Sequence, residues 1–505
     1  MSKEKFRDLK KLAKVIKEAT KRTLPVLDLK AERTLEDEFF RKILQVENEE
    51  ALVSQLYDTT NTKHHPYRVL RDRFEEKALN NLLLIDYTKV EMNVSEKEKL
   101  IAIKQFYLAE VLIATNQPEL AKKLLKEALE VFITYEKPSL QLEVLKHLLS
   151  PKFTNFFKEK EIVAFQKLAT QSNITAFYDN ESSLLMREIN TLVVKADTKA
   201  RTPIKELEIK VARLKELWET TQLSIIYFRY LWAQVVTLQT QGKWEAVLAI
   251  LDTSEALIKS KKLNLKVFKV GYISNVKVFT LAMLKRYEEA VTYGQAQLKY
   301  FGGGNYNTYI FQLNYAQALS YAGHYQQVFN LIETLEKSAN WSVVISRVQE
   351  EFYLIKAYAT FLLDQPVDFT ALCDKMARLH QKPLGMNLNL RILELLLDLK
   401  RQDRLSFERN LKNLKNSWYA HTKKKQREQS RTNRFLIMLS QIVSLEHTLS
   451  LAQLKDKSRY HYNKLRQQPL EGVVKTDFEP VPYEQLWDYI LHLLQTQSGT
   501  YQSKI

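Results

Sequence analysis

The stretch Leu313-Asn-Tyr-Ala-Gln-Ala-Leu-Ser-Tyr-Ala-Gly-His-Tyr-Gln-Gln-Val328 decides the fold of this chain. Ala316 is followed three residues later by Leu319, and Gly323 and Tyr325 follow before a second apolar pattern begins. A small residue lets a neighbouring helix approach closely, and glycine adopts the left-handed conformation that ends a helix at little cost. The stretch therefore predicts one helix, a tight turn at Gly323 and an antiparallel partner helix.

Similar turns recur elsewhere in the chain. Gly242-Lys-Trp244-Glu-Ala-Val247 and Lys285-Arg-Tyr287-Glu-Glu-Ala290 each follow an apolar run of helical length, and Asn116-Gln-Pro118-Glu-Leu-Ala121 is an earlier copy. The turn aromatics Trp244, Tyr287 and Tyr325 lie 43 and 38 positions apart. This recurrence predicts a row of helix pairs.

The order of a small residue, a large apolar residue, Gly, Tyr and another small residue resembles the tetratricopeptide repeat, whose usual period is about 34 residues. The longer spacing here is typical of degenerate, stretched repeats, and the resemblance covers about half of the chain. It implies an all-α protein, an α-solenoid of antiparallel helix pairs with atypical capping helices at both ends. In such a solenoid the first helix of each pair lines an inner surface where partner peptides bind.

Carrying the family's inward-facing positions onto the three clearest units implies a set of partner-binding residues. They are Arg229, Trp232 and Thr240 in the first unit, Tyr272, Asn275 and Phe279 in the second, and Leu313, Gln317 and Tyr321 in the third. The asparagine would hold a peptide backbone, and the aromatic side chains would supply anchors. The alternative for the aromatic residues, Trp232 among them, is that they only pack between helices.

Composition agrees with an all-helical chain. Only ten glycines occur in 505 residues and none precedes Gly242, so the first half has almost no residue suited to tight hairpins. The single cysteine, Cys373, excludes an intramolecular disulfide and any multi-cysteine zinc site. No secretion signal and no run near the roughly 18 apolar residues of a membrane span is present, which predicts an intracellular, cytoplasmic protein.

Changes in pattern along the chain predict four regions. Residues 1–94 form an N-terminal helical region, 95–220 degenerate repeats, 221–455 tetratricopeptide-like repeats, and 456–505 an extended segment with a capping helix. The basic amphipathic helix expected at 3–22 and the apolar-striped helix at 483–495 would cover the faces that terminal repeats leave open.

The net charge of +17 is concentrated in two windows. Residues 1–22 carry nine Lys or Arg against three acids, residues 400–434 carry twelve against three, and the rest of the chain is close to neutral. Such windows either bind phosphate groups or keep an extended protein soluble. The candidate phosphate-binding residues are Lys423, Lys424, Lys425, Arg427, Arg431 and Arg434.

No catalytic or cofactor motif emerges from the sequence. It has no His-Glu-x-x-His pair, no nucleophile elbow, no dinucleotide fingerprint and no kinase set, and the Gly-Gly-Gly run at 302–304 lacks the ending of a P-loop. We therefore expect neither an enzyme nor a bound metal or cofactor. The expected function is that of a scaffold or adaptor that binds a protein or peptide along its inner surface. The alternative is a nucleic-acid-associated helical protein that uses the two basic windows.

The alternative makes its own prediction. Binding to nucleic acid through the second window would weaken steeply between about 50 and 200 mM salt, because released counterions drive it. Replacing Lys423, Lys424, Lys425 and Arg427 by Gln would abolish that binding in a filter or polarisation assay. Unchanged affinity of this variant would eliminate the alternative.

Overall fold

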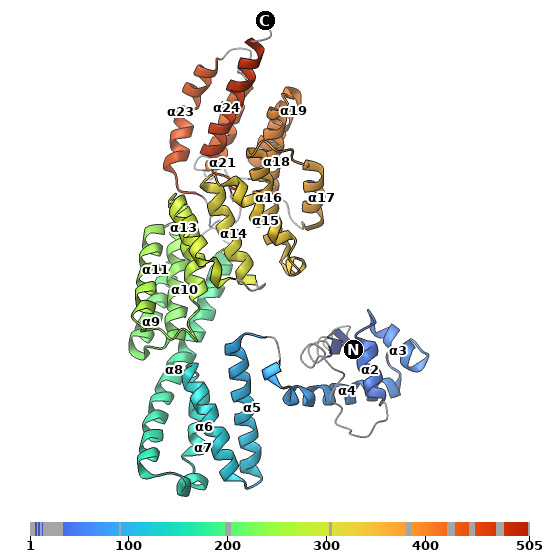
Figure 1. Ribbon diagram of the computed structural model, residues 1–505, viewed down its shortest axis with the longest axis vertical. Coiled ribbons are helices and arrows are strands. Elements are labelled where there is room, and N and C mark those ends of the chain that lie inside the picture. Colours follow the sequence, from blue (N-terminus) through green and yellow to red (C-terminus); the bar gives the residue numbers. More distant parts are fainter. Residues whose placement is uncertain are drawn as a thin grey trace. The chain divides into compact units, whose positions relative to one another are not determined.

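The computed structural model describes residues 6–7, 9–10, 13, 34–89, 92–196, 204–301, 306–379, 385–421, 430–443, 450–470 and 479–502. These residues form α-helices and short 3-10 helices, with no β-strand among them. Consecutive helices pack against one another in pairs joined by short turns (Figure 1). The prediction of an all-α protein made of antiparallel helix pairs is therefore confirmed.

The chain divides into two compact units, of which the first comprises Met1–Leu184 and Glu219–Ile226. Its helices are α2 (Leu35–Ile43), α3 (Glu49–Tyr57), α4 (His65–Leu84), η1 (Tyr87–Lys89), α5 (Val94–Ala114), α6 (Pro118–Thr134), α7 (Pro138–Leu148), η2 (Pro151–Phe156) and the first part of α8 (Glu159–Ala196). Phe6, Leu9 and Ala13 of the expected N-terminal helix are buried with Phe39 and Phe74 of α2 and α4. Of that expected helix, only Arg7 and Lys10 are described besides these three residues.

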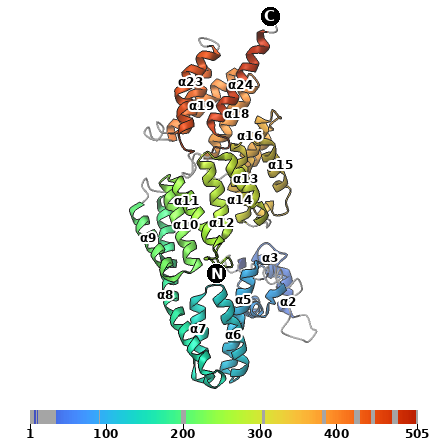
Figure 2. The same ribbon diagram turned by 60° about the vertical axis from the view of Figure 1, so that its left-hand side comes forward.

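The second unit comprises Leu185–Trp218 and Tyr227–Ile505. Beyond the end of α8 it is built from most of α9 (Ile204–Thr221) and of α10 (Ser224–Thr240), and from α11 (Trp244–Lys259), α12 (Val270–Met283), α13 (Tyr287–Gln297), η3 (Leu298–Tyr300), α14 (Tyr306–Tyr321), α15 (Tyr325–Glu336), η4 (Trp341–Val343), α16 (Ser346–Leu362), α17 (Phe369–Leu379), α18 (Gly385–Lys400), α19 (Arg404–His421), α21 (Arg431–Ile442), α23 (Leu451–Gln467) and α24 (Tyr483–Gln502). Within this unit α12, α13 and α14 lie side by side (Figure 2).

Close helix packing in the second unit depends on one glycine that the sequence pattern did not mark. A Cβ atom on Gly294 of α13 would lie 2.5 Å from the Tyr315 ring of α14, inside contact distance. Glycine costs a helix interior about 1 kcal/mol. That cost is tolerated here because the missing side chain lets α13 pack closely against Tyr315 of α14.

The turn that the sequence predicts at Gly323 is repeated through both units. The second residue after the helix adopts a positive φ at Asn116, Glu136, Gly242, Lys261, Lys285, Gly323, Asp364 and Gln402. In each case the next amide N–H donates to a carbonyl five residues earlier, as His324 N does to Leu319 O at 2.9 Å. This is the Schellman arrangement, which satisfies carbonyls that the helix end leaves unbonded.

The predicted capping helix at the C-terminal end begins at Tyr483, as expected, and continues to Gln502 as α24. Trp487 and Ile490 are buried in one hydrophobic core with Phe435 and Leu439 of α21 and with residues of α16, α18 and α19. The ring of Phe435 stacks on Tyr483 with centroids 4.6 Å apart. This helix therefore covers the apolar face of the last helices of the second unit.

None of the described helices is long and apolar enough to cross a membrane.

The turn geometry yields a pair of opposite predictions. Gly323→Ala should destabilise the turn by about 1 kcal/mol, because alanine is strained at a φ of +80°. The added methyl group would meet nothing within 4 Å, so the cost comes from the backbone conformation alone. Gln402→Gly should stabilise its turn by about 0.5 kcal/mol, because it removes a side chain from the left-handed region at φ 59°. Hydrogen exchange of the helices flanking each turn measures both effects, and shifts of equal sign would contradict the explanation.

Candidate functional site

The first set of predicted partner-binding residues lies on α10. Arg229 is half-buried, and Trp232 is half-buried against Leu207, Val211 and other residues of the core around α9. Thr240 is exposed, and its hydroxyl donates to the Val236 carbonyl at 2.8 Å. Trp232 thus packs between helices while part of its surface stays open.

The second set lies on α12 and remains partly accessible. Tyr272 meets Phe228 edge to face with ring centroids 5.4 Å apart, and burial raises the pKa of the Tyr272 hydroxyl well above its usual range. Asn275 accepts a hydrogen bond from the Asn314 side-chain amide at 2.8 Å. Phe279 packs edge to face against Trp244. These contacts hold the side chains in place without covering them.

The third set, on α14, lies in the interior. Leu313 is buried in the core that α14 shares with α12 and α13. Gln317 is 6% exposed and Tyr321 is 1% exposed, and the Gln317 amide donates to the Tyr321 hydroxyl oxygen at 2.6 Å. The inward-facing positions of this repeat are therefore filled by contacts within the chain.

The segment that covers α14 comes from the C-terminal part of the same chain. The Tyr321 hydroxyl donates to the Glu479 carbonyl and the Ser320 hydroxyl donates to the Pro480 carbonyl, each at 2.7 Å. The Gln485 amide donates back to the Tyr321 carbonyl at 2.7 Å. Leu470 is buried with the turn aromatic Trp244 and with Tyr321. The chain thus supplies Glu479, Pro480 and Gln485 of its own C-terminal part to a place where the family resemblance implies a partner peptide.

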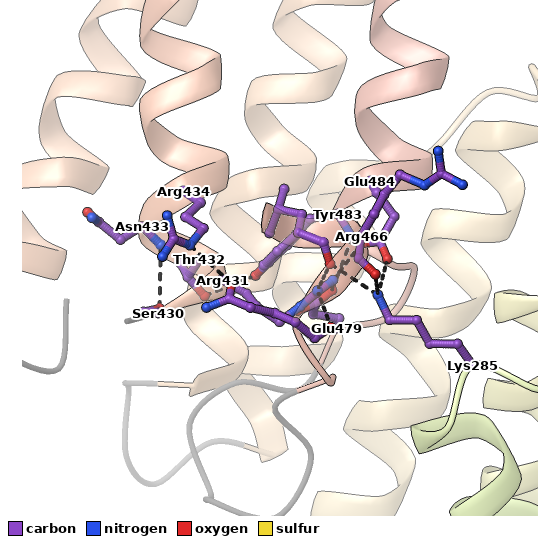
Figure 3. A network of polar contacts seen from close by, with 12 residues as sticks. Lys285, Ser430, Arg431, Thr432, Asn433, Arg434, Arg466, Glu479, Tyr483 and Glu484 are labelled. Carbon is purple, nitrogen blue, oxygen red and sulfur yellow. Dashed lines mark hydrogen bonds and ion pairs between the residues drawn. The ribbon is translucent and has the colours of Figure 1, made fainter. Parts of the chain in front are cut away.

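A buried ionic network anchors this segment (Figure 3). The Arg431 side chain is completely buried, and its guanidinium binds Glu479 through two hydrogen bonds of 2.6 and 3.0 Å and Glu484 through one of 2.5 Å. Lys285 contacts Glu484 at 2.7 Å. Two cations therefore face two carboxylates. Burial raises the pKa of Glu479 despite its contact with Arg431.

Helix ends explain why these charges are accommodated inside the protein. The carbonyls of Leu465, Arg466 and Gln468, at the C-terminal end of α23, accept hydrogen bonds from Arg431 or Lys285. Cations favour this end of a helix, and Glu484 occupies the first turn of α24, where negative charge is favoured. Burial alone would raise the pKa of Glu484, but Arg431 and Lys285 hold that pKa below its usual range.

The predicted phosphate-binding residues fall into three groups. Lys423, Lys424, Lys425 and Arg427 lie outside the described residues. Arg431 faces internal carboxylates, as described. Arg434 is half-buried and donates to the Gln468 side chain at 3.1 Å. The structure therefore directs Arg431 toward the protein interior and not toward an external anion.

An aromatic cluster that the sequence reasoning did not single out connects α9, α10 and α12. Tyr227 and Phe268 are buried at its base, while Trp218, Tyr230 and Tyr272 are half-buried around them. The Trp218 ring lies parallel to that of Tyr230 at a centroid distance of 6.4 Å. The sequence signal that could have indicated this cluster is the stretch Tyr227-Phe-Arg-Tyr-Leu-Trp232, in which four of six residues are aromatic. Phe228 is the sixth member of the aromatic cluster, which thus includes the predicted residue Tyr272, and the predicted residue Arg229 lies between Phe228 and Tyr230 in the sequence.

A groove of about 410 Å³ runs between α9 and α10 next to the aromatic cluster. Tyr230 belongs to both features, and Lys215, Gln234, Gln241 and Lys243 contribute polar groups to the groove. This volume lies within the range of about 300–1,000 Å³ that is typical of ligand sites. The described residues contain no group of three or more His, Cys, Asp or Glu side chains that could hold a metal ion.

Comparisons of the chain with protein-family models, with curated proteins and with solved structures returned no match. Function must therefore be argued from the groups that the fold brings together.

The ionic network leads to a stability prediction. Arg431→Met should lower the free energy of unfolding by about 3–5 kcal/mol, because two buried carboxylates lose their main partner. Arg434→Met, three residues away and half-buried, should cost only about 1 kcal/mol. Urea unfolding followed by circular dichroism measures both variants.

A triple variant separates lost charge pairing from lost packing. Replacing Glu479 and Glu484 by Leu together with Arg431→Met should recover much of the lost stability, since no buried charge is then left unpaired. Equal costs for the two single arginine variants would contradict the role assigned to the network.

Proposed function

We propose that this chain is a helical-repeat scaffold that binds a protein partner through the surface formed by α10 and α12. The observation that supports the proposal is the aromatic cluster, in which buried Tyr227 and Phe268 support four partly exposed rings. Trp, Tyr and Arg dominate the residues that supply most binding energy in protein interfaces. Arg229 lies between two members of the cluster in the sequence and is itself half-buried.

The packing of the cluster favours binding energetically. Phe228 contacts both Phe268 and Tyr272 edge to face, at 5.9 and 5.4 Å, so its ring is already oriented before any partner arrives. Because these side chains are already held in place, they lose little conformational freedom on association, and the binding affinity is higher as a result. The polar groups of Asn275 and Arg229 at the same surface would provide hydrogen bonds around the rings.

The position of α14 limits the surface that a partner would use. Tyr321 binds the C-terminal segment of the same chain and Gln317 donates to the Tyr321 hydroxyl, so we assign the partner to α10 and α12 and not to α14. The nucleic-acid alternative now rests mainly on Lys423, Lys424, Lys425 and Arg427, because Arg431 is paired internally.

The proposal predicts a specific loss of partner binding. The double variant Phe228→Ala/Tyr272→Ala should recover the partner at least tenfold less well in affinity capture from the native cell, because two anchors of the surface are removed. Tyr306→Ala/Tyr460→Ala is the matched control, since those rings are 54% and 62% exposed and lie outside the cluster. Quantitative mass spectrometry of the captured proteins measures the effect.

Two further measurements make the result decisive. Circular dichroism and thermal unfolding should show that the double variant is folded. Capture is repeated after nuclease treatment, which should leave the partner in place. Recovery that the double variant leaves unchanged, or that nuclease abolishes, would refute the proposal.

A further inference from the structure

We propose that the second unit binds the surface of an anionic lipid bilayer through one end of its row of helices. This end is formed by the connections α11–α12, α13–α14 and α15–α16. We call residues 259–269, 298–301, 306 and 337–346 of these connections the connection edge. The inference goes beyond the proposed function, which assigns a protein partner to α10 and α12.

Contacts between the connections bring them to the same end of the row. A Cβ atom on Gly271, at the start of α12, would lie 3.3 Å from the ring of Phe301, which precedes α14. The ring of Tyr309, in the first turn of α14, meets the ring of Trp341 edge to face at 6.4 Å, and Trp341 precedes α16. The helices α12, α14 and α16 therefore start side by side, and the connections that precede them share one edge.

The connection edge is strongly basic. Its sequence contains seven lysines and no Asp or Glu, and five of the seven lie within residues 259–269. These five lysines are all exposed, and neither Lys261 nor Lys262 forms an ion pair with a residue that the structure describes. Lys337, by contrast, pairs with Glu333 at 3.3 Å. The positive charge of the edge is therefore concentrated at the α11–α12 connection.

Exposed apolar side chains gather on the same edge. Among the side chains that the structure describes between residues 210 and 404, the large hydrophobic ones that are exposed are Leu265, Tyr300, Tyr306 and Ile345. All four belong to the connection edge, and each of the three connections contributes at least one. The ammonium group of Lys299 lies 5.0 Å from the centre of the Tyr300 ring, so positive charge and apolar surface are adjacent.

This combination of side chains favours a bilayer over other polyanions. Anionic headgroups attract lysines close to the membrane surface, while apolar side chains enter the boundary between headgroups and acyl chains. Tyrosine is enriched at that boundary. Proteins hold the backbone of a nucleic acid by hydrogen bonds to phosphate and sugar, from which the aliphatic side chains of Leu265 and Ile345 would gain nothing. Three neighbouring connections at one end of the helix row can also meet a flat surface together.

Flotation with lipid vesicles tests the inference on the full chain. Vesicles of phosphatidylcholine are compared with vesicles in which phosphatidylserine replaces about a third of that lipid, and we expect the chain to float only with the anionic ones. A lysine near an anionic surface contributes about fivefold to the partition coefficient, so Lys261→Gln/Lys262→Gln should lower that coefficient at least about tenfold. Leu265→Ser should lower it about threefold or more, because an inserted apolar side chain is lost.

Matched variants outside the connection edge control for general effects. Lys455→Gln/Lys457→Gln removes two exposed lysines of α23, and Leu405→Ser replaces a leucine that is 83% exposed, against 55% for Leu265. Both should bind anionic vesicles as the unmodified chain does, and circular dichroism should show that all variants are folded. Lys269 is left unchanged because its ammonium group lies over the ring of Phe228, a member of the aromatic cluster.

A fluorescent probe measures insertion independently of affinity. In a Cys373→Ser background, which removes the single cysteine, Leu265→Cys or Leu405→Cys carries a dye whose emission shifts to the blue in an apolar environment. Anionic vesicles should shift the emission of the dye at position 265 and leave the dye at position 405 unchanged.

Three results would overturn the inference. They are absence of binding to anionic vesicles, equal losses in the edge variants and their controls, and no shift of the dye at position 265. In a parallel assay with a short single-stranded RNA, binding that Lys261→Gln/Lys262→Gln abolishes and Leu265→Ser leaves unchanged, without binding to vesicles, would assign the edge to nucleic acid instead. Capture of the protein partner is measured separately, so either proposal can fail without the other.

Discussion

The second unit depends on the pairing of a completely buried guanidinium with two carboxylates. Removing Arg431, Glu479 and Glu484 from water is costly, and it is tolerated only because every charge has a close partner and further hydrogen bonds surround it. These partners come from α21, from the segment before α24 and from α24 itself, while Lys285 joins them from the turn after α12. Parts of the chain that are distant in sequence are thereby held in one arrangement.

This pairing also changes the interpretation of the repeat surface. Of the residues that a tetratricopeptide-like pattern directs toward a partner, Tyr321 instead binds the backbone of the protein's own C-terminal segment, and Gln317 donates to the Tyr321 hydroxyl. The hydroxyl of Tyr321 and that of Ser320 recognise two successive carbonyls, as they would in an external peptide. What remains open is the neighbouring surface of α10 and α12, with the aromatic cluster and the groove beside it.

Much of the fold was predictable because it follows from local pattern. The turn at Gly323, the start of α24 at Tyr483 and the burial of Phe6, Leu9 and Ala13 all follow from helical periodicity and from residues that end or begin helices. The ionic network was not predictable in this way. Lys285 and Glu484 are 199 positions apart, and neither residue differs in local sequence from an exposed charge on a helical protein. Pairings at such separations are set by tertiary packing, which one sequence does not display.

Lys285 illustrates how a distant contact can overrule a local preference. Its φ of 61° is one that glycine would adopt without strain, and two other turns of the same kind do use glycine. Glycine at this place would have no ammonium group to give to the end of α23 and to Glu484. Lysine at this turn thus keeps a strained backbone conformation and in return forms hydrogen bonds to residues distant in the sequence. Repeat signatures that require glycine here will overlook units of this kind, since the side chain that they exclude is the one that joins the turn after α12 to α23 and α24.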